Sequence, residues 1–166
     1  MIVYNSVMSI WHNDQKFDDL SKFSVNLDKH LGIEYLEIGD DFIKSRMPVD
    51  ERTKQPMGLL HGGASCALAE STASMAAFLS VDMSEKVAVG LSLHANHLKS
   101  VTEGYVYAKA MPLHIGRSTS LWNVEITDED DNMVCRVTFT ALCKDCLLYT
   151  SPSPRDLSTS RMPSSA

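Results

Sequence analysis

The chain of 166 residues is 44% hydrophobic, the size and composition of one globular domain with a single buried core. Its formal net charge of -6 argues against a nucleic-acid-binding protein, which would need a basic surface to neutralise phosphates. No stretch reaches the roughly 18 apolar residues of a membrane span, and the N-terminus lacks the pattern of a secretory signal, so we expect a cytoplasmic protein that binds no membrane.

The predicted elements begin with a short helix within residues 18–30, followed by a hairpin of two strands, 32–37 and 42–49. Residues 61–81 are rich in Ala, Leu and Met and too long for an ordinary strand, so they predict one long helix. The apolar period then falls to two, which predicts four more strands, at residues 87–100, 104–112, 119–127 and 133–144. Residues 128–132 are interpreted as the last hairpin turn and Trp122 as a core residue. One long helix against an antiparallel sheet is an α+β arrangement.

The C-terminal residues 146–166 are rich in Ser and Pro and follow neither the helical nor the strand period. We expect this tail to be disordered or non-native, and we assign the domain to residues 1–145. The four cysteines, Cys66, Cys135, Cys143 and Cys146, lack the paired spacing and nearby histidines of a zinc site. We therefore predict reduced thiols and no metal site.

Glu70 is the only charged residue between Lys54 and Asp82, and it lies in the middle of the long predicted helix. A helix that is apolar all round is expected to be buried. An ionised carboxylate there costs several kcal/mol unless it is paired, hydrogen-bonded or beside a water-filled pocket. Glu70 is thus either a catalytic group or a side chain that reaches solvent or a cation from another element. Ser74 lies one turn later on the same face and could orient the carboxylate or a water molecule.

The long helix is preceded by His61 and starts with Gly62 and Gly63. Two glycines let a ligand approach the backbone closely, and the free N–H groups at the positive end of the helix can stabilise an oxyanion. Glycine pairs also mark ordinary turns, and His61 could be a structural helix cap. Together with Glu70, however, this helix start supplies the two parts that acyl transfer needs.

The segment RTKQPMGLLHGGASCALAES, residues 52–71, resembles the signature of hotdog-fold acyl-CoA thioesterases. Within them it is most similar to the group that includes 1,4-dihydroxy-2-naphthoyl-CoA hydrolase of menaquinone synthesis and the proofreading thioesterase of enterobactin synthesis. The resemblance covers residues 31–143 and continues through GL at residues 90–91, NH at 96–97 and PLHIGR at 112–117. It implies a hotdog fold, an antiparallel sheet wrapped around one long helix, and hydrolysis of acyl-CoA to free acid and CoA.

Carried over residue by residue, the resemblance implies that Glu70 acts as nucleophile or general base at the thioester carbonyl, supported by Ser74. Gln55 and His61 would position the carbonyl and the attacking water, and the Gly62 amide would form the oxyanion hole. The residues implied in binding the substrate and its CoA portion are Gly63, His97, Lys99, His114, Gly116, Arg117 and Ser118. Lys99 and Arg117 are candidate phosphate contacts, or else ordinary solvated charges. Because CoA is part of the substrate, no cofactor is expected.

The resemblance also implies active sites shared across a dimer interface and two dimers paired into a homotetramer, which would cover a strand edge and an apolar helix. Two other functions remain open: a hotdog enoyl-CoA hydratase or dehydratase, and a non-catalytic acyl-CoA-binding module. The sequence does not identify the acyl group. We expect Met57, Met75 and Phe78 to shape its pocket and to give some preference for aryl-CoA.

Overall fold

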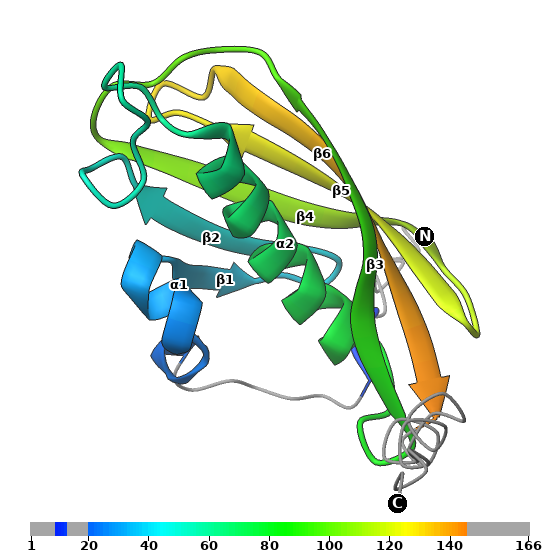
Figure 1. Ribbon diagram of the computed structural model, residues 1–166. Coiled ribbons are helices and arrows are strands. Elements are labelled where there is room, and N and C mark those ends of the chain that lie inside the picture. The colour runs from blue at the N-terminus through cyan, green and yellow to red at the C-terminus, as the bar shows by residue number, and fades with distance from the viewer. Residues whose placement is uncertain (1–8, 13–19, 146–166) are drawn as a thin grey trace, which may run out of the picture.

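The computed structural model describes residues 9–12 and 20–145 (Figure 1). Residues 1–8, 13–19 and 146–166 lie outside the described residues, so the prediction of a disordered or non-native tail stays a prediction. In chain order the elements are η1 (Leu20–Phe23), α1 (Asn26–Leu31), β1 (Glu34–Ile38), β2 (Ile43–Pro48), α2 (Gly62–Leu79), β3 (Lys86–His97), β4 (Tyr105–Ile115), β5 (Thr119–Thr127) and β6 (Met133–Asp145).

The strands form one six-stranded antiparallel sheet in the order β1-β2-β4-β5-β6-β3. The single long helix α2 lies across one face of this sheet, which curves so that β3 runs beside the helix (Figure 1). The structure confirms the α+β fold predicted from the sequence. Within the described residues, no helix combines the length and the apolar character that a membrane crossing requires.

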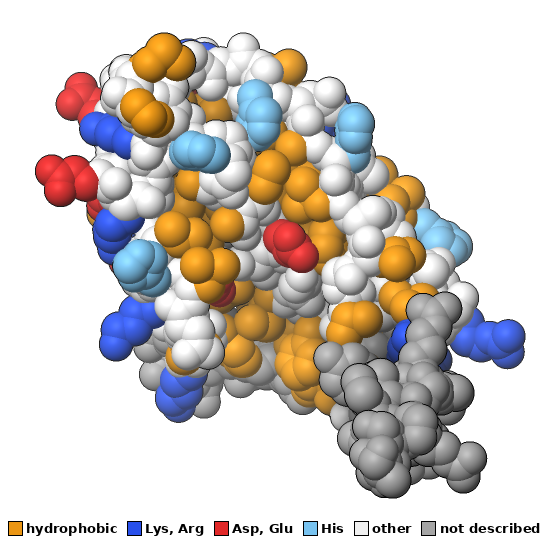
Figure 2. Space-filling view, in the orientation of Figure 1, with side chains coloured by type: hydrophobic (Ala, Val, Ile, Leu, Met, Phe, Trp, Pro, Cys, Tyr) orange, Lys and Arg blue, Asp and Glu red, His pale blue; other side chains and the backbone are white. Residues whose placement is uncertain are grey.

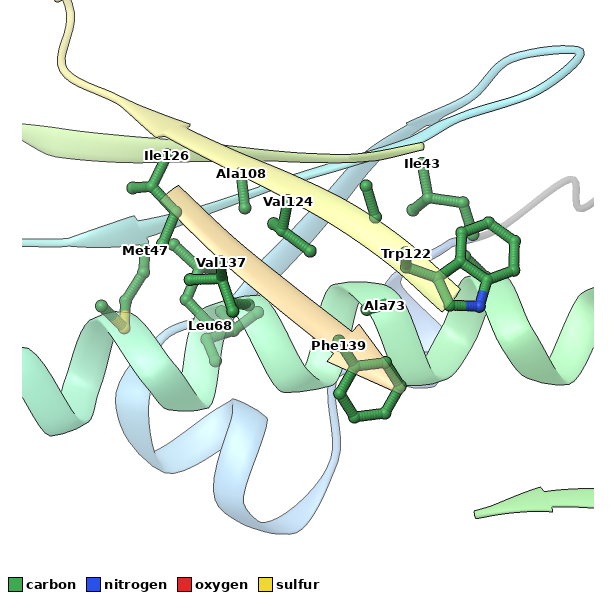
Figure 3. Packing of buried hydrophobic residues seen from close by; sticks show 14 of the residues in the cluster. Ile43, Met47, Leu68, Ala73, Ala108, Trp122, Val124, Ile126, Val137 and Phe139 are labelled. Atoms are coloured by element: carbon green, nitrogen blue, oxygen red, sulfur yellow. The ribbon is translucent and has the colours of Figure 1, made fainter. Parts of the chain in front are cut away.

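The core lies between α2 and the sheet (Figure 3). Alanines on the buried side of α2, Ala69, Ala73, Ala76 and Ala77, let the helix backbone approach the strands closely, and Leu68 packs with them. Trp122 is fully buried, as predicted, and its Nε1 donates to the Ser120 hydroxyl at 2.9 Å. The buried Thr72 hydroxyl donates to the Leu68 carbonyl, so a buried polar group is satisfied inside the helix.

Two strand ends lie three residues from their predicted positions, and the other strand ends lie within two residues of them. β4 continues to Ile115 instead of ending at Pro112, because the pairing with β5 shifts by one residue between Pro112 and His114. Such a bulge tolerates a proline, which has no N–H for the ladder. β3 ends at His97 instead of residue 100, where the Leu98 N–H turns to the Val134 carbonyl. Residues 128–132 do form the predicted hairpin turn, closed by a bond from the Asp128 N–H to the Asn132 carbonyl.

β3 is an unpaired edge of the sheet, and most of its side chains are exposed or half-buried. Leu91 at its centre is 59% exposed and Leu98 just beyond its end is 62% exposed. Leu91 is also the extra residue of a bulge, since the pairing with β6 shifts between Gly90 and Ser92. A long edge with exposed apolar side chains is a surface that natural proteins usually cover or pair.

Candidate active site

The start of α2 leaves one backbone donor free. His61 caps the helix: its Nδ1 accepts from the Gly63 N–H at 2.8 Å, and its carbonyl accepts from the Ala64 and Ser65 N–H groups. Among the described residues, the Gly62 N–H has no partner. The positive end of an 18-residue helix thus presents one unused amide at the place predicted for an oxyanion hole.

The hydrogen bonds of His61 also define its tautomer. Because Nδ1 accepts a hydrogen bond, the proton of the neutral ring is on Nε2, which remains a donor on an exposed side chain. The backbone N–H of His61 is tied to the Thr53 carbonyl at 2.8 Å, so the ring is fixed to the loop before the helix. His61 therefore acts as a helix cap and still offers a donor.

Gln55 is positioned by a tight loop that precedes α2. Its carbonyl accepts from the Gly58 N–H, and its side-chain Oε1 accepts from the Met57 N–H. The side-chain amide nitrogen, which has no partner within the described part of the chain, is left as a donor. Gln55 and Gly62 line one pocket of about 350 Å³ together with His97 and Lys99.

Glu70 is exposed in this single chain, which corrects the expectation of a helix buried on all sides. The reason is that α2 packs on the sheet with one side only, and Glu70 lies on the open side. Figure 2 shows one acidic side chain over α2, between hydrophobic side chains, and Glu70 is the only acid in this helix. Its carboxylate has no hydrogen-bond or ion-pair partner in the described ranges 9–12 and 20–145.

Glu70 and Ser74 line a second pocket, of about 500 Å³. Its apolar walls are Phe23, Leu27, Tyr35, Ala67 and Met75. Of the three side chains predicted to shape an acyl pocket, Met75 lies here, whereas Met57 is 80% exposed on the loop and Phe78 lies at the end of α2.

The wall formed by α1 is held in place through Asp28. Its carboxylate accepts from the Ser71 hydroxyl at 2.6 Å and from the Tyr35 hydroxyl at 3.0 Å, which joins α1, α2 and β1. Burial, and then the Asp28 charge, raises the pKa of the Tyr35 hydroxyl above its ordinary value. Tyr35 is therefore a fixed, uncharged wall. The sequence pattern of residues 18–30 does not indicate where this helix docks. Phe23, Leu27 and Tyr35 were therefore not predicted as walls of a pocket.

The described cysteines, Cys66, Cys135 and Cys143, are unpaired thiols, and Cys146 lies outside the described residues. Burial, followed by the negative charge of Glu70, raises the pKa of Cys66. Burial raises the pKa of Cys135 to about 11. Neither is a reactive thiolate near neutral pH. No three His, Cys, Asp or Glu side chains of the described residues are grouped to hold a metal.

The residues predicted to bind CoA fall into two groups. His97 and Lys99 lie at the end of β3, in the pocket of Gln55 and Gly62. Lys99 forms an ion pair with Asp128 and so lowers the pKa of that carboxyl to about 2. The Lys99 charge is thus already partly neutralised. Gly63 is exposed at the helix start, and its N–H is used by His61.

His114, Gly116, Arg117 and Ser118 form the second group, at the turn between β4 and β5. This turn is held by bonds from the Gly116 N–H to the Thr119 carbonyl and from the Cys143 N–H to the Ser118 carbonyl. The second group thus lies at Cys143 of β6, whereas His97 of the first group pairs with Cys135 of the same strand. The two groups are therefore about 27 Å apart along β6. One chain does not bring them together.

The two halves of the predicted catalytic set are also separate. Gly62 and Glu70 are eight residues apart on α2, about 12 Å along the helix axis. Gln55 and Gly62 line one pocket, and Glu70 and Ser74 line the other. The chain therefore contains a set of unused hydrogen-bond donors and a free carboxylate, each in its own pocket.

Comparison with known proteins places these features in a family. The family model described as "Thioesterase superfamily" matches residues 57–135. The proofreading thioesterase EntH of Cronobacter turicensis is 45% identical over 127 residues, which cover 76% of this chain and 92% of that protein.

Solved structures similar to this chain include thioesterases. A thioesterase from Haemophilus influenzae superposes with a TM-score of 0.80 at 38% identity, covering 86% of this chain and 99% of that one. A glutamate-to-alanine variant of a Staphylococcus aureus protein gives a TM-score of 0.70 at 32% identity, covering 72% and 99%. A glutamine-to-alanine variant of the same protein, there called a thioesterase, gives 0.68 at 31%, covering 70% and 96%. The hotdog architecture expected from the sequence is confirmed.

Proposed function

We propose that this chain, which belongs to the thioesterase superfamily and is a thioester hydrolase, acts on acyl-CoA thioesters with aromatic or similarly bulky acyl groups. The observation that carries the proposal is the pair of unused groups on α2: the Gly62 N–H at the helix start and the Glu70 carboxylate on the open side. Acyl transfer needs a donor for the oxyanion and a carboxylate for attack or proton transfer.

The carbonyl oxygen of the thioester would accept from the Gly62 N–H. The Gln55 amide nitrogen and the His61 Nε2–H are two further donors near this helix start. As negative charge develops on the oxygen, these donors stabilise it without reorganisation. Loss of one such donor typically reduces kcat by on the order of 10² to 10³.

Glu70 would either attack the acyl carbon directly or take a proton from an attacking water, with Ser74 orienting the carboxylate or the water. In both routes the carbon–sulfur bond breaks, a water oxygen ends on the acyl carbon, and the departing CoA sulfur receives a proton. The glutamine and glutamate replaced in the two Staphylococcus aureus variants are fifteen residues apart, as are Gln55 and Glu70. This equal separation supports the assignment of the pair.

A complete site would form between two copies of the chain. The exposed edge of β3 can pair antiparallel with β3 of a second copy about a two-fold axis near Leu91. Such pairing would cover the open side of α2 and would bring Glu70 of one copy close to the Gly62 amide of the other. Two of these dimers would associate further into a homotetramer.

The same two-fold pairing would join the two groups of CoA contacts. In an antiparallel pair centred near Leu91, His97 of one chain lies opposite residue 86 of the other. Lys86 contacts the turn that carries Arg117, with its Nζ 3.4 Å from the Arg117 carbonyl. The phosphates of CoA would then lie between His97 and Lys99 of one copy and the turn of residues 114–118 of the other. Of the two cations, Arg117 is the stronger candidate, since Asp128 holds Lys99.

The acyl group would occupy the pocket beside Glu70. Its volume of about 500 Å³ and its walls of Phe23, Tyr35 and Met75 suit a planar ring better than a short acetyl group. EntH, a proofreading thioesterase, is among the similar proteins. CoA esters and the unpaired cysteines of the described residues are consistent with a reducing, cytoplasmic location.

The test is thiol release from benzoyl-CoA, a naphthoyl-CoA and a medium-chain acyl-CoA. We expect turnover of all three, with the aryl esters giving the highest kcat/KM. Hydration of an enoyl-CoA without thiol release would move the assignment to a hydratase. Binding of all three esters without turnover would indicate a binding module and contradict the proposal.

A further inference from the structure

Gly90 lies on β3 where the strand passes the Glu70 side chain. A Cβ atom at Gly90 would be 2.9 Å from Glu70 Oε1 and 3.3 Å from Phe139 Cε2. Cβ atoms essentially never approach other heavy atoms closer than 3.0 Å. Any larger residue here would therefore have to displace the carboxylate, the ring or the strand.

The backbone does not explain this glycine. The described glycines with positive φ are Gly32, Gly58 and Gly104, so Gly90 has a conformation open to other residues. Glycine inside a strand weakens it, and it often marks a close approach of another group. The bulge at Leu91 follows immediately and bends the strand. The space that Gly90 leaves is the property that accounts for it.

The two neighbours differ in how easily they move. Phe139 is 1% exposed and packed in the core, so its ring resists displacement. Glu70 is exposed and held by no hydrogen bond in the described part of the chain, so its carboxylate is the group that would move. A methyl group at residue 90 would then push the carboxylate away from β3.

We propose that Gly90 is a positioning residue for Glu70: its missing side chain lets the carboxylate lie against the bulged edge of β3, where the thioester carbonyl of the bound substrate is attacked. This inference rests on the catalytic role proposed for Glu70. Gly90 itself touches no reacting atom. Its effect is on the placement of the carboxylate, and misplacement by about 1 Å can cost on the order of 10² in rate.

The experiment measures kcat and KM for benzoyl-CoA hydrolysis in Gly90→Ala, Glu70→Gln and the double variant. We expect Gly90→Ala to lower kcat by about 10- to 100-fold with little change in KM. In the Glu70→Gln background the same change should cost nothing further, because the group it displaces no longer acts. The control is Thr138→Val, a change of nearly equal size at an exposed residue of β6 that lines neither pocket, and it should keep full activity.

Each outcome has one meaning. Loss of activity in Glu70→Gln with full activity in Gly90→Ala overturns the role of Gly90 and leaves that of Glu70 intact. Full activity in Glu70→Gln overturns the proposed function of Glu70 itself. An equal loss from Gly90→Ala in both backgrounds indicates general damage and also overturns the proposal.

Should Gly90→Ala fail to fold, Glu70→Asp supplies the comparison. The shorter aspartate withdraws the carboxylate from β3, so the double variant with Gly90→Ala should fold and match Glu70→Asp alone in kcat. A double variant that folds but is at least tenfold slower than Glu70→Asp would contradict the proposal.

Discussion

Mixing two inactive variants should restore activity if each site takes residues from two chains. Gln55 and Glu70 line different pockets, and Gly62 and Glu70 are about 12 Å apart along α2, too far for both to contact one thioester carbonyl. Gln55→Ala impairs the carbonyl-binding half and Glu70→Gln the carboxylate half. A hybrid dimer of the two variants has one site with both changes and one site with neither.

The expected activity of the mixture follows from the fraction of sites that are intact. Random assembly of equal amounts gives hybrids in about half of the dimers, each with one of two sites intact, so the mixture should reach about a quarter of the parent activity. The assay is benzoyl-CoA hydrolysis after the two variants are co-refolded, with hybrids isolated through two different affinity tags. The matched control is Gln55→Ala mixed with His61→Ala, which alter the same half and should stay inactive.

A hybrid of Gln55→Ala and Glu70→Gln that is formed in the expected amount but remains inactive would refute the reasoning. Each Glu70 would then act with Gln55 of its own chain, and α2 or the loop of residues 54–60 would have to move to bring them together. Recovery in the control mixture would equally contradict the division into two halves.

Three further changes have expected outcomes. Leu68→Ala, at a fully buried position on α2, should lower the free energy of unfolding by about 2 to 5 kcal/mol in urea titrations. The pKa of Asp128 is lowered from 3.8 to about 2 in the fold, so its stabilising effect is present above pH 4 and is lost as the pH falls toward 2. The difference in the free energy of unfolding between the parent and Asp128→Asn should therefore vanish over that range. A difference that stays constant with pH would contradict this stabilising effect of Asp128. Arg117→Ala should raise KM for CoA esters more than Lys99→Ala at low salt, because Asp128 already neutralises Lys99; the reverse order would contradict the assignment.

The α+β fold was predictable because its signals are local. The alanine-rich run of α2 and the period of two in β3 to β6 are visible in single stretches of sequence. The end of β4 was predicted wrongly, since a proline inside a strand is tolerated only where a bulge removes the need for its N–H, and pairing register is a property of two strands.

The candidate site was predictable in composition but not in arrangement. Glu70 stood out as the one acid in an apolar run, yet its exposure depends on which sides of α2 meet the sheet, a fact of tertiary structure. The pocket walls Phe23 and Tyr35 come from segments that dock through Asp28, far from the motif in sequence. Gly90 falls inside the predicted strand of residues 87–100, but the reason for a glycine there was hidden until its neighbour Glu70 was known.

The most direct measurement is kcat for benzoyl-CoA hydrolysis by the parent and by Glu70→Gln, with Glu85→Gln, an exposed glutamate outside both pockets, as the control. We predict that Glu70→Gln folds normally and loses about 10² to 10⁴ in kcat with KM little changed, while Glu85→Gln equals the parent. A folded Glu70→Gln that turns over as fast as the parent would contradict the assignment of this carboxylate to the chemical step.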